Sequence, residues 1–189
     1  LKLHRATGLV NAVLRKVSLP EELSEADRLN HPAWLVSRWR ARHGDAVEGW
    51  CAANNQNPPL FVALRADEDA DALRRQRLEL FPAEIRGEPV PGVLRVVGHR
   101  GPVTELAGWE DGRLLVQDAA AAAVVDLLGD VDGAEVLDAC AAPGGKSFRL
   151  AWRGARVRAV DREEPRLERL RQAAGRLQLA VPARVHDWT

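Results

Sequence analysis

Methionine and tyrosine are absent from this chain of 189 residues, and cysteine and lysine are scarce. Because no methionine is present, the chain cannot begin at its own start codon, and we expect it to be an internal piece of a longer protein. Two cysteines, Cys51 and Cys140, are too few for the disulfide framework of a small secreted domain. Only three of the 27 lysine and arginine residues are lysines, so the positive charge is almost entirely arginine.

Long apolar runs and a basic leader followed by an apolar segment are also missing. Without a run of about 18 apolar residues, a membrane-spanning helix is excluded, and we expect a cytoplasmic protein with no membrane partner. The formal net charge is zero, so no global positive field indicates nucleic acid, although a binding face needs only local charge. The histidines and cysteines show no metal-ligand spacing, so no metal is expected.

The N-terminal part of the chain is predicted to be helical. Residues 5–17 carry apolar side chains on one helical stripe, and this helix is too short to fold alone. We interpret residues 1–19 as the last helix of a preceding domain, and the polar residues 20–30 as a linker. From His31 the pattern is helical again, and Gly44 divides it into two short helices.

Residues 31–112 are predicted to form a small α+β middle subdomain. After the two helices, the Asn- and Pro-rich residues 54–59 favour an extended exit into a strand over Leu60–Leu64. A surface helix is expected over residues 67–80, because its leucines alternate with acids and arginines. Short strands punctuated by glycine and proline are expected over residues 85–116.

From Gln117 the pattern changes to alternating helices and strands. Alanine is the strongest helix former, so an alanine-rich helix is predicted over Ala119–Leu128. Strands are predicted at Val136–Ala139, Val157–Val160 and Ala183–His186, with helices between them from Lys146 and over Glu163–Leu179. This alternation is typical of the first half of a doubly wound, Rossmann-like parallel sheet. Residues 113–189 are therefore predicted to form the truncated N-terminal half of an α/β domain.

A loop of small residues after the first of these strands is the candidate binding site. It consists of Asp138, Ala139, Cys140, Ala141, Ala142, Pro143, Gly144, Gly145 and Lys146. Small residues let the backbone approach a ligand, and a helix N-terminus offers free N–H groups to a carboxylate or phosphate. The loop is not a phosphate-binding GxxxxGK[ST] loop, because Cys140 occupies the position of its first glycine.

Two acidic residues follow later strands. Asp161 ends the second strand, where a carboxylate can hold the hydroxyls of a ribose. NAD and S-adenosylmethionine both contain such a diol, and the loop favours the latter because NAD would need its pyrophosphate at the helix end. Asp187, after the third strand, could accept a hydrogen bond from an adenine amino group. A solvated strand end or a helix cap is the alternative for each acid.

The segment DACAAPGGK resembles the glycine loop of the RNA 5-methylcytosine methyltransferases, a Rossmann-like family. That family includes the bacterial Fmu/Sun type, which acts on small-subunit (16S) ribosomal RNA. GLVNAVLRKV resembles the closing helix of its NusB-like RNA-binding domain, and HPAWLVSRW and ANNQNPPLFVALR resemble its middle subdomain. LAGWEDGRLLVQDAAAA resembles the start of its catalytic domain, so the resemblance covers nearly the whole chain.

The resemblance implies a role for each candidate residue. Residues Cys140 to Lys146 would wrap the methionine end of the cofactor S-adenosylmethionine, Asp161 would bind the ribose hydroxyls, and Asp187 would lie near the adenine. Two departures from the family pattern are visible. His186-Asp187-Trp188 stands where the family usually has Gly-Asp followed by a small or basic residue, and Ser147 replaces a common threonine.

The resemblance also implies a mechanism in which a cysteine thiolate attacks carbon 6 of cytosine, so that carbon 5 can accept the methyl group. That nucleophile is expected beyond Thr189, so the chain contains no catalytic residue and is expected to be inactive. Cys140 is expected to line the cofactor pocket, and Cys51 to pack in a core.

Ribosomal RNA is the expected partner, and a monomer is expected. One alternative is a Rossmann methyltransferase that acts on another RNA such as tRNA, and another is a non-catalytic RNA-binding module. The arginines at positions 153, 156, 158, 162 and 166 could contact phosphate, and the six tryptophans could stack on bases. A solvated face or core packing is the alternative for each of these residues.

Overall fold

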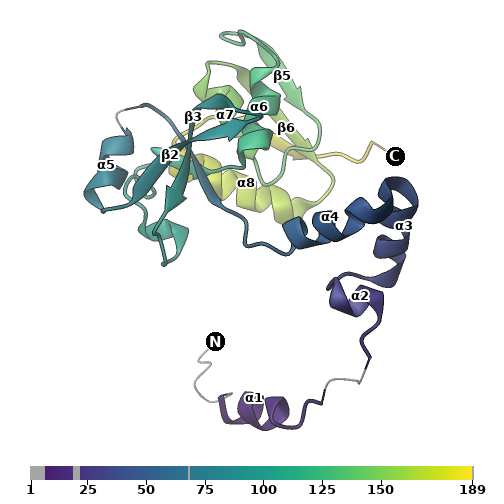
Figure 1. The fold of residues 1–189 in the computed structure, drawn as a ribbon. Helices are drawn as coiled ribbons and strands as arrows, with labels where there is room; N and C mark the ends of the chain where they lie inside the picture. Colours follow the sequence, from purple (N-terminus) through teal and green to yellow (C-terminus); the bar gives the residue numbers. More distant parts are fainter. Residues whose placement is uncertain (1–6, 19–21, 68, 189) are drawn as a thin grey trace. The chain divides into compact units, whose positions relative to one another are not determined.

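A computed structural model describes residues 7–18, 22–67 and 69–188 of the chain. The chain forms two compact units, residues 1–58 and residues 59–189 (Figure 1). The expected middle subdomain 31–112 is therefore divided, with its residues 31–58 in the first unit and its residues 59–112 in the second. No helix in the described ranges is long and apolar enough to cross a membrane.

The first unit is helical. Its elements are α1 (Thr7–Leu14), α2 (Glu25–Arg28), α3 (Ala33–His43), the short 3-10 helix η2 (Gly44–Ala46) and α4 (Val47–Asn54). Val36, Val47 and Cys51 are its fully buried hydrophobic residues. Gly44 separates α3 from the next helix with a φ of +58°, which confirms the predicted break. Core packing of Cys51, which has no exposed surface, is also confirmed.

The stretch predicted as a linker, residues 20–30, contains the short helix α2, and its role as a linker stays a prediction. The Ser24 side chain caps this helix by accepting a hydrogen bond from the Asp27 backbone N–H at 3.2 Å. Serine and aspartate are typical of both loops and helix N-termini, so composition could not separate the two. Residues 19–21 lie outside the described ranges.

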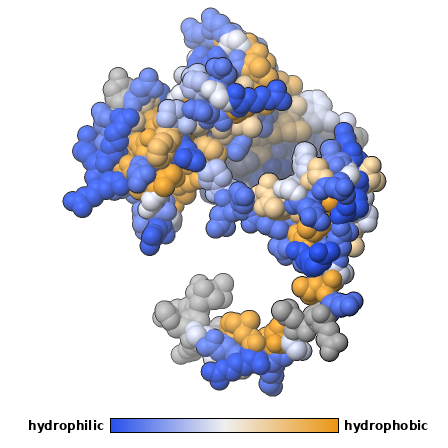
Figure 2. Space-filling model, in the orientation of Figure 1, coloured by the Kyte–Doolittle hydropathy of each residue, from blue (hydrophilic) through white to orange (hydrophobic). Residues whose placement is uncertain are grey.

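Helix α1 confirms the predicted helical stripe over residues 7–14. Its apolar residues Leu9, Val10, Val13 and Leu14 are each at least half exposed, and Figure 2 shows the hydrophobic surface of this helix. That the helix closes a NusB-like domain stays a prediction, and residues 1–6 of this segment lie outside the described ranges.

The N-terminal part of the second unit is an antiparallel sheet in the order β2-β3-β1-β4. Its elements are β1 (Leu60–Leu64), α5 (Asp69–Arg75), β2 (Glu79–Ile85), β3 (Glu88–Val97), η3 (Val103–Glu105) and β4 (Leu114–Val116). One face packs Val62 and Leu64 against Leu73 of α5. The other face contributes Ala63 and Leu115 to a core shared with the C-terminal helices.

The helix predicted over residues 67–80 is shorter than expected and is not a surface helix throughout. It ends at Arg75, its residue Leu73 has no exposed surface, and Leu80 belongs to β2. Leu80 pairs with Val96 in the neighbouring strand β3. Pairing with the next strand along the chain therefore overrides the local helical pattern at this point.

The C-terminal part of the second unit is a parallel sheet in the order β5-β6-β7. Its elements are α6 (Ala119–Asp126), β5 (Glu135–Asp138), α7 (Gly145–Trp152), β6 (Arg156–Asp161), α8 (Glu164–Leu177) and β7 (Ala183–Val185). Val157 and Ala159 of β6 pack with Leu167 and Leu170 of α8 in the shared core. The predicted alternation of strands and helices is confirmed.

Two arginines tie the C-terminal helices to the antiparallel sheet. Arg149 of α7 is 6% exposed and donates to both carboxylate oxygens of Asp126 and to the carbonyl of Pro91. The guanidinium of Arg176 in α8 lies 3.8 Å from the centre of the Trp109 ring and donates to the Trp109 carbonyl at 2.6 Å. These contacts fix the positions of α7 and α8, the two helices that flank the candidate site.

Candidate functional site

A cavity of about 370 Å³ opens at the carboxyl ends of the three parallel strands. It is lined by Ala139, Cys140, Asp161, Arg162, Glu163, Arg166, Asp187 and Trp188. Its size falls within the range of small-molecule sites, and it lies where open parallel sheets bind ligands. The structure therefore brings Cys140, Asp161 and Asp187 together, whereas the other predicted loop residues, 141–146, do not line this cavity.

Asp161 is the most buried acid of the cavity, with 4% of its surface exposed. One carboxylate oxygen accepts a hydrogen bond from the Ala142 N–H at 3.0 Å, and the other accepts one from the Glu163 N–H at 3.2 Å. Burial by itself raises the pKa of Asp161, but the N–H groups of Glu163 and Ala142 and the charge of Arg166 outweigh it. The net effect lowers the pKa below its usual value, so Asp161 is ionised at neutral pH.

Arg166 joins the glycine loop to this carboxylate. Its Nη2 donates to the Ala142 carbonyl at 2.5 Å, and its Nη1 lies 3.6 Å from Oδ2 of Asp161. The sequence suggested that this arginine could contact phosphate, but in the structure it already has two partners at the site. Its side chain is 44% exposed, so the ion pair is partly solvated and its main effect is to orient the loop.

The loop itself is held against β6 by its backbone. The Ala141 N–H donates to the Val160 carbonyl at 3.0 Å, and the Gly144 N–H donates to the Ala141 carbonyl at 2.7 Å. Gly144 has a φ of +112°, and a Cβ at this position would lie 2.4 Å from the Phe148 ring. Both the backbone conformation and the close approach therefore require glycine here.

Ser147 connects the loop helix to the end of β5. Its side chain is fully buried and donates a hydrogen bond of 2.7 Å to a carboxylate oxygen of Asp138. This bond needs only a hydroxyl group, so the replacement of threonine by serine leaves the contact intact. Pro143 and Lys146 are exposed, and no side chain caps the N-terminus of α7 at Gly144. The backbone at this end of the helix is thus available to a ligand.

Gln117 is a residue at the site that the sequence reasoning missed. It is 4% exposed, and its side-chain Nε2 and Oε1 are buried without a hydrogen-bond partner among the described residues. Its Nε2 lies 3.6 Å from where a Cβ of Gly145 would stand, so it is next to the first residue of α7. An unpaired buried amide is costly and commonly marks a place for a ligand or water. The sequence signal was a polar residue directly between the buried strand β4 and the capping residue Asp118.

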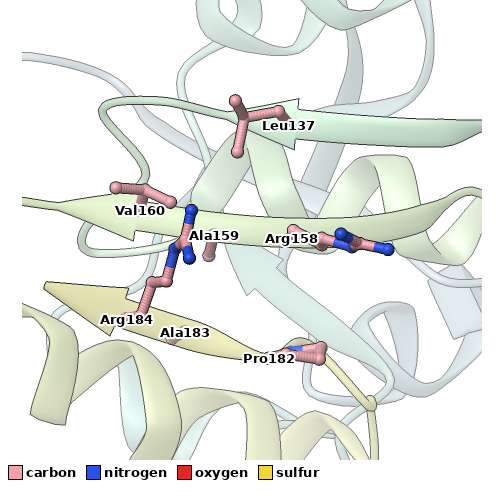
Figure 3. Close-up of a pocket in the computed structure, with 7 residues that line it drawn as sticks. All are labelled: Leu137, Arg158, Ala159, Val160, Pro182, Ala183 and Arg184. Carbon is pink, nitrogen blue, oxygen red and sulfur yellow. The ribbon is translucent and has the colours of Figure 1, made fainter. Parts of the chain in front are cut away.

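A second, smaller hollow of about 180 Å³ lies on the sheet itself, as Figure 3 shows. It is lined by Leu137, Arg158, Ala159, Val160, Pro182, Ala183 and Arg184. Leu137 is 54% exposed on this side of the sheet, whereas its neighbour Val136 packs against the core. The lining includes two arginines and no acidic residue, so the hollow offers no carboxylate to a ribose diol.

Two protein families match parts of the chain. Residues 31–78 match a ferredoxin-like domain described as methyltransferase RsmF/B-like, and residues 125–187 match the family described as 16S rRNA methyltransferase RsmB/F. The second match contains the glycine loop, Asp161 and Asp187. The first match begins at the helices of the first unit and continues into the antiparallel sheet.

Whole-chain similarities agree with these matches. The ribosomal RNA small subunit methyltransferase B of Yersinia pestis is 36% identical over 99% of this chain, which spans 46% of that protein's length. The chain thus spans about half the length of the curated relatives that it matches. The solved methyltransferase homolog protein from Pyrococcus horikoshii has the same fold, with a TM-score of 0.69, 20% identity, and coverage of 87% of this chain and 56% of its own.

A second similar structure is that of NSun6 from the same archaeon, solved with SFG, an analogue of S-adenosylmethionine. Its TM-score is 0.62 at 13% identity, over 84% of this chain and 65% of NSun6. At this identity the likeness concerns the fold alone.

Proposed function

The chain belongs to the RsmB/F family of methyltransferases, and from this membership we propose that it is the cofactor-binding part of an S-adenosylmethionine-dependent ribosomal RNA methyltransferase. The observation that carries the proposal is the buried, ionised Asp161, which is hydrogen-bonded to the glycine loop at the mouth of a ligand-sized cavity. That a similar fold was solved with an S-adenosylmethionine analogue supports the same cofactor.

The charges of the cavity favour a cationic ligand. Three carboxylates and two guanidinium groups line it, which gives a net charge of −1. Both guanidinium groups lie near carboxylates, since Arg162 is 3.6 Å from Glu163 and Arg166 is 3.6 Å from Asp161. S-adenosylmethionine carries a net positive charge, whereas the pyrophosphate of NAD is negative and would meet a lining of the same sign. The lining therefore supports the sulfonium cofactor over a dinucleotide.

We assign the parts of the cofactor to the predicted residues. Asp161 binds the ribose hydroxyls, because a carboxylate can accept about four hydrogen bonds and two are already provided by the backbone. Asp187 accepts from the adenine amino group. The loop from Cys140 to Lys146 wraps the methionine end, and its donors are the N–H groups of Gly145 and Lys146 at the start of α7, because those of Ala141, Ala142 and Gly144 already bond within the protein. The Gln117 amide offers a further donor and an acceptor beside the same helix end.

For the reaction we propose methylation of carbon 5 of a cytosine in small-subunit ribosomal RNA. The cofactor supplies the methyl group, and this chain binds and orients the cofactor. Neither of its cysteines fits the attacking thiolate, because Cys51 is buried in a core and Cys140 belongs to the proposed cofactor loop. We therefore propose that the nucleophile comes from another part of the parent protein, so that this chain alone does not transfer a methyl group.

Calorimetric titration of the chain with S-adenosylmethionine tests the cofactor assignment. Asp161→Asn should raise the Kd by roughly tenfold or more, because hydrogen bonds to a charged group contribute about 1.5–3 kcal/mol each. Asp71→Asn, which removes an exposed acid paired with Arg74 on α5, is the matched control and should bind like the wild type. Equal affinity of the wild type and Asp161→Asn for S-adenosylmethionine would contradict the assignment of Asp161 to the cofactor.

Two alternatives to the ribosomal substrate are separated by RNA experiments. Tighter binding of the chain to tRNA than to small-subunit ribosomal RNA would favour a tRNA methyltransferase. RNA binding without any affinity for S-adenosylmethionine would favour a non-catalytic RNA-binding module. Transfer of a labelled methyl group by the chain alone would contradict the proposal that the nucleophile lies elsewhere.

A further inference from the structure

Trp188 stands across the carboxyl end of the parallel sheet. It follows β7, and its indole Nε1–H donates a hydrogen bond of 3.0 Å to the carbonyl of Ala139, which follows β5. The strand order is β5-β6-β7, so a side chain that joins the ends of the two outer strands passes the end of β6. The last residue of β6 is Asp161, and both Trp188 and Asp161 line the same cavity.

The Trp188 indole has a fixed orientation but is not buried. It forms a T-shaped pair with the His186 ring, with ring centres 4.4 Å apart at an angle of 79°. Trp188 nevertheless remains 54% exposed and belongs to none of the hydrophobic cores of the described residues. Core packing therefore does not explain its position. An aromatic ring whose polar edge is satisfied and whose surface is accessible is suited to stacking on a flat ligand.

We propose that Trp188 is the aromatic wall of the cofactor site, against which the adenine ring packs, and hence a specificity-determining residue of this chain. The inference rests on the proposed function, because the adenine belongs to the cofactor assigned there. It adds a contact with the face of the purine to the edge contact assigned to Asp187. Since the hydrogen bond to Ala139 already orients the indole, little side-chain entropy remains to be lost on binding.

An aromatic wall discriminates by shape and stacking, and we expect purine-containing ligands to gain from it, whereas the methionine end of the cofactor does not.

Two substitutions in the 189-residue chain separate stacking from hydrogen bonding. Trp188→Ala removes both, whereas Trp188→Phe keeps an aromatic ring and loses the N–H group. Calorimetric titration would use S-adenosylmethionine and 5′-methylthioadenosine, which keeps the adenine and ribose but lacks the amino acid. For both ligands, Trp188→Ala should raise the Kd roughly three- to tenfold, and Trp188→Phe by no more than about twofold.

Tryptophan fluorescence provides a readout that a merely structural role would not change. 5′-Methylthioadenosine should quench the emission of the wild type, and this quenching should be lost in Trp188→Phe, although five other tryptophans remain. Circular dichroism of both variants should match the wild type, because the side chain is half exposed and outside the cores.

Three results would overturn the inference while leaving the proposed function in place, provided that the wild type binds both ligands. Unchanged affinity of Trp188→Ala would show that the indole makes no contact, and tighter binding would show that it occupies the place of the ligand. An equal loss in Trp188→Phe and Trp188→Ala would assign the effect to the Ala139 hydrogen bond instead of the ring. If the wild type bound neither ligand, the proposed function itself would fail, and the inference with it.

Discussion

Replacing Gly144 by alanine should strongly destabilise the unit that carries the site. Gly144 precedes α7 with a φ of +112°, where a side chain is strained. A Cβ there would lie 2.4 Å from two ring atoms of Phe148 and 3.1 Å from Cγ of Leu170. Phe148 is 2% exposed and Leu170 is fully buried, so neither side chain can move aside into solvent.

The expected magnitude follows from two costs. A non-glycine residue in this region of backbone space costs about 1–3 kcal/mol. Forcing an extra methyl group into a packed core costs about 1–3 kcal/mol more. The free energy of unfolding should therefore fall by about 4 kcal/mol, a large fraction of the roughly 5–15 kcal/mol that stabilises a typical domain.

Two other glycines of the same unit provide matched controls. Gly129 also has a positive φ, +69°, but no atom lies within 4 Å of its would-be Cβ. Gly129→Ala should therefore show only the backbone cost, about 1–2 kcal/mol. Gly175 lies in α8 with neither a positive φ nor a neighbour within 4 Å, so Gly175→Ala should stabilise the unit by about 0.5–1 kcal/mol.

Urea unfolding followed by circular dichroism measures all three variants. The predicted order of stability is Gly175→Ala, wild type, Gly129→Ala and then Gly144→Ala. If Gly144→Ala were no less stable than Gly129→Ala, the close approach between the loop and Phe148 would be refuted, because that contact should add to the backbone cost at Gly144.

Two further predictions concern the cavity. A thiol reagent should modify one cysteine per folded chain, the exposed Cys140, and two in denaturant, because Cys51 is buried. S-adenosylmethionine should slow the modification of Cys140. An unchanged rate would contradict a place for Cys140 in the cofactor loop. The folded pKa of Asp161 is below its ordinary value of 3.8, so its ionised form stabilises the fold above pH 3.8, and this contribution is lost as the pH falls through the folded pKa. The stability gap between wild type and Asp161→Asn, measured by urea unfolding, should therefore shrink as the pH decreases below about 4, and a constant gap would count against the ionised, hydrogen-bonded carboxylate.

The sequence by itself determined the elements whose patterns are local. The strands β1, β5 and β6 were predicted nearly to their ends, because short apolar runs between turn residues indicate strands. Burial was not predicted as well, since no residue of β5 is buried. The loop of small residues before α7 was also a local pattern, because it stands directly between a predicted strand and a predicted helix. A local pattern gave a wrong prediction at the end of residues 67–80, where a helix was expected and the chain instead pairs as β2 with β3.

Tertiary structure alone decided which groups meet at the site. Asp161 accepts from a loop N–H 19 residues away, Trp188 donates to a carbonyl 49 residues away, and Gln117 reaches the helix that begins at Gly145. These contacts depend on the order of strands in the sheet and on the packing of α6 and α7, which side-chain periodicity along one segment does not encode. The sequence thus identifies the residue types of the site. The hydrogen-bond partners that lower the pKa of Asp161 and orient the Trp188 indole follow only from the fold.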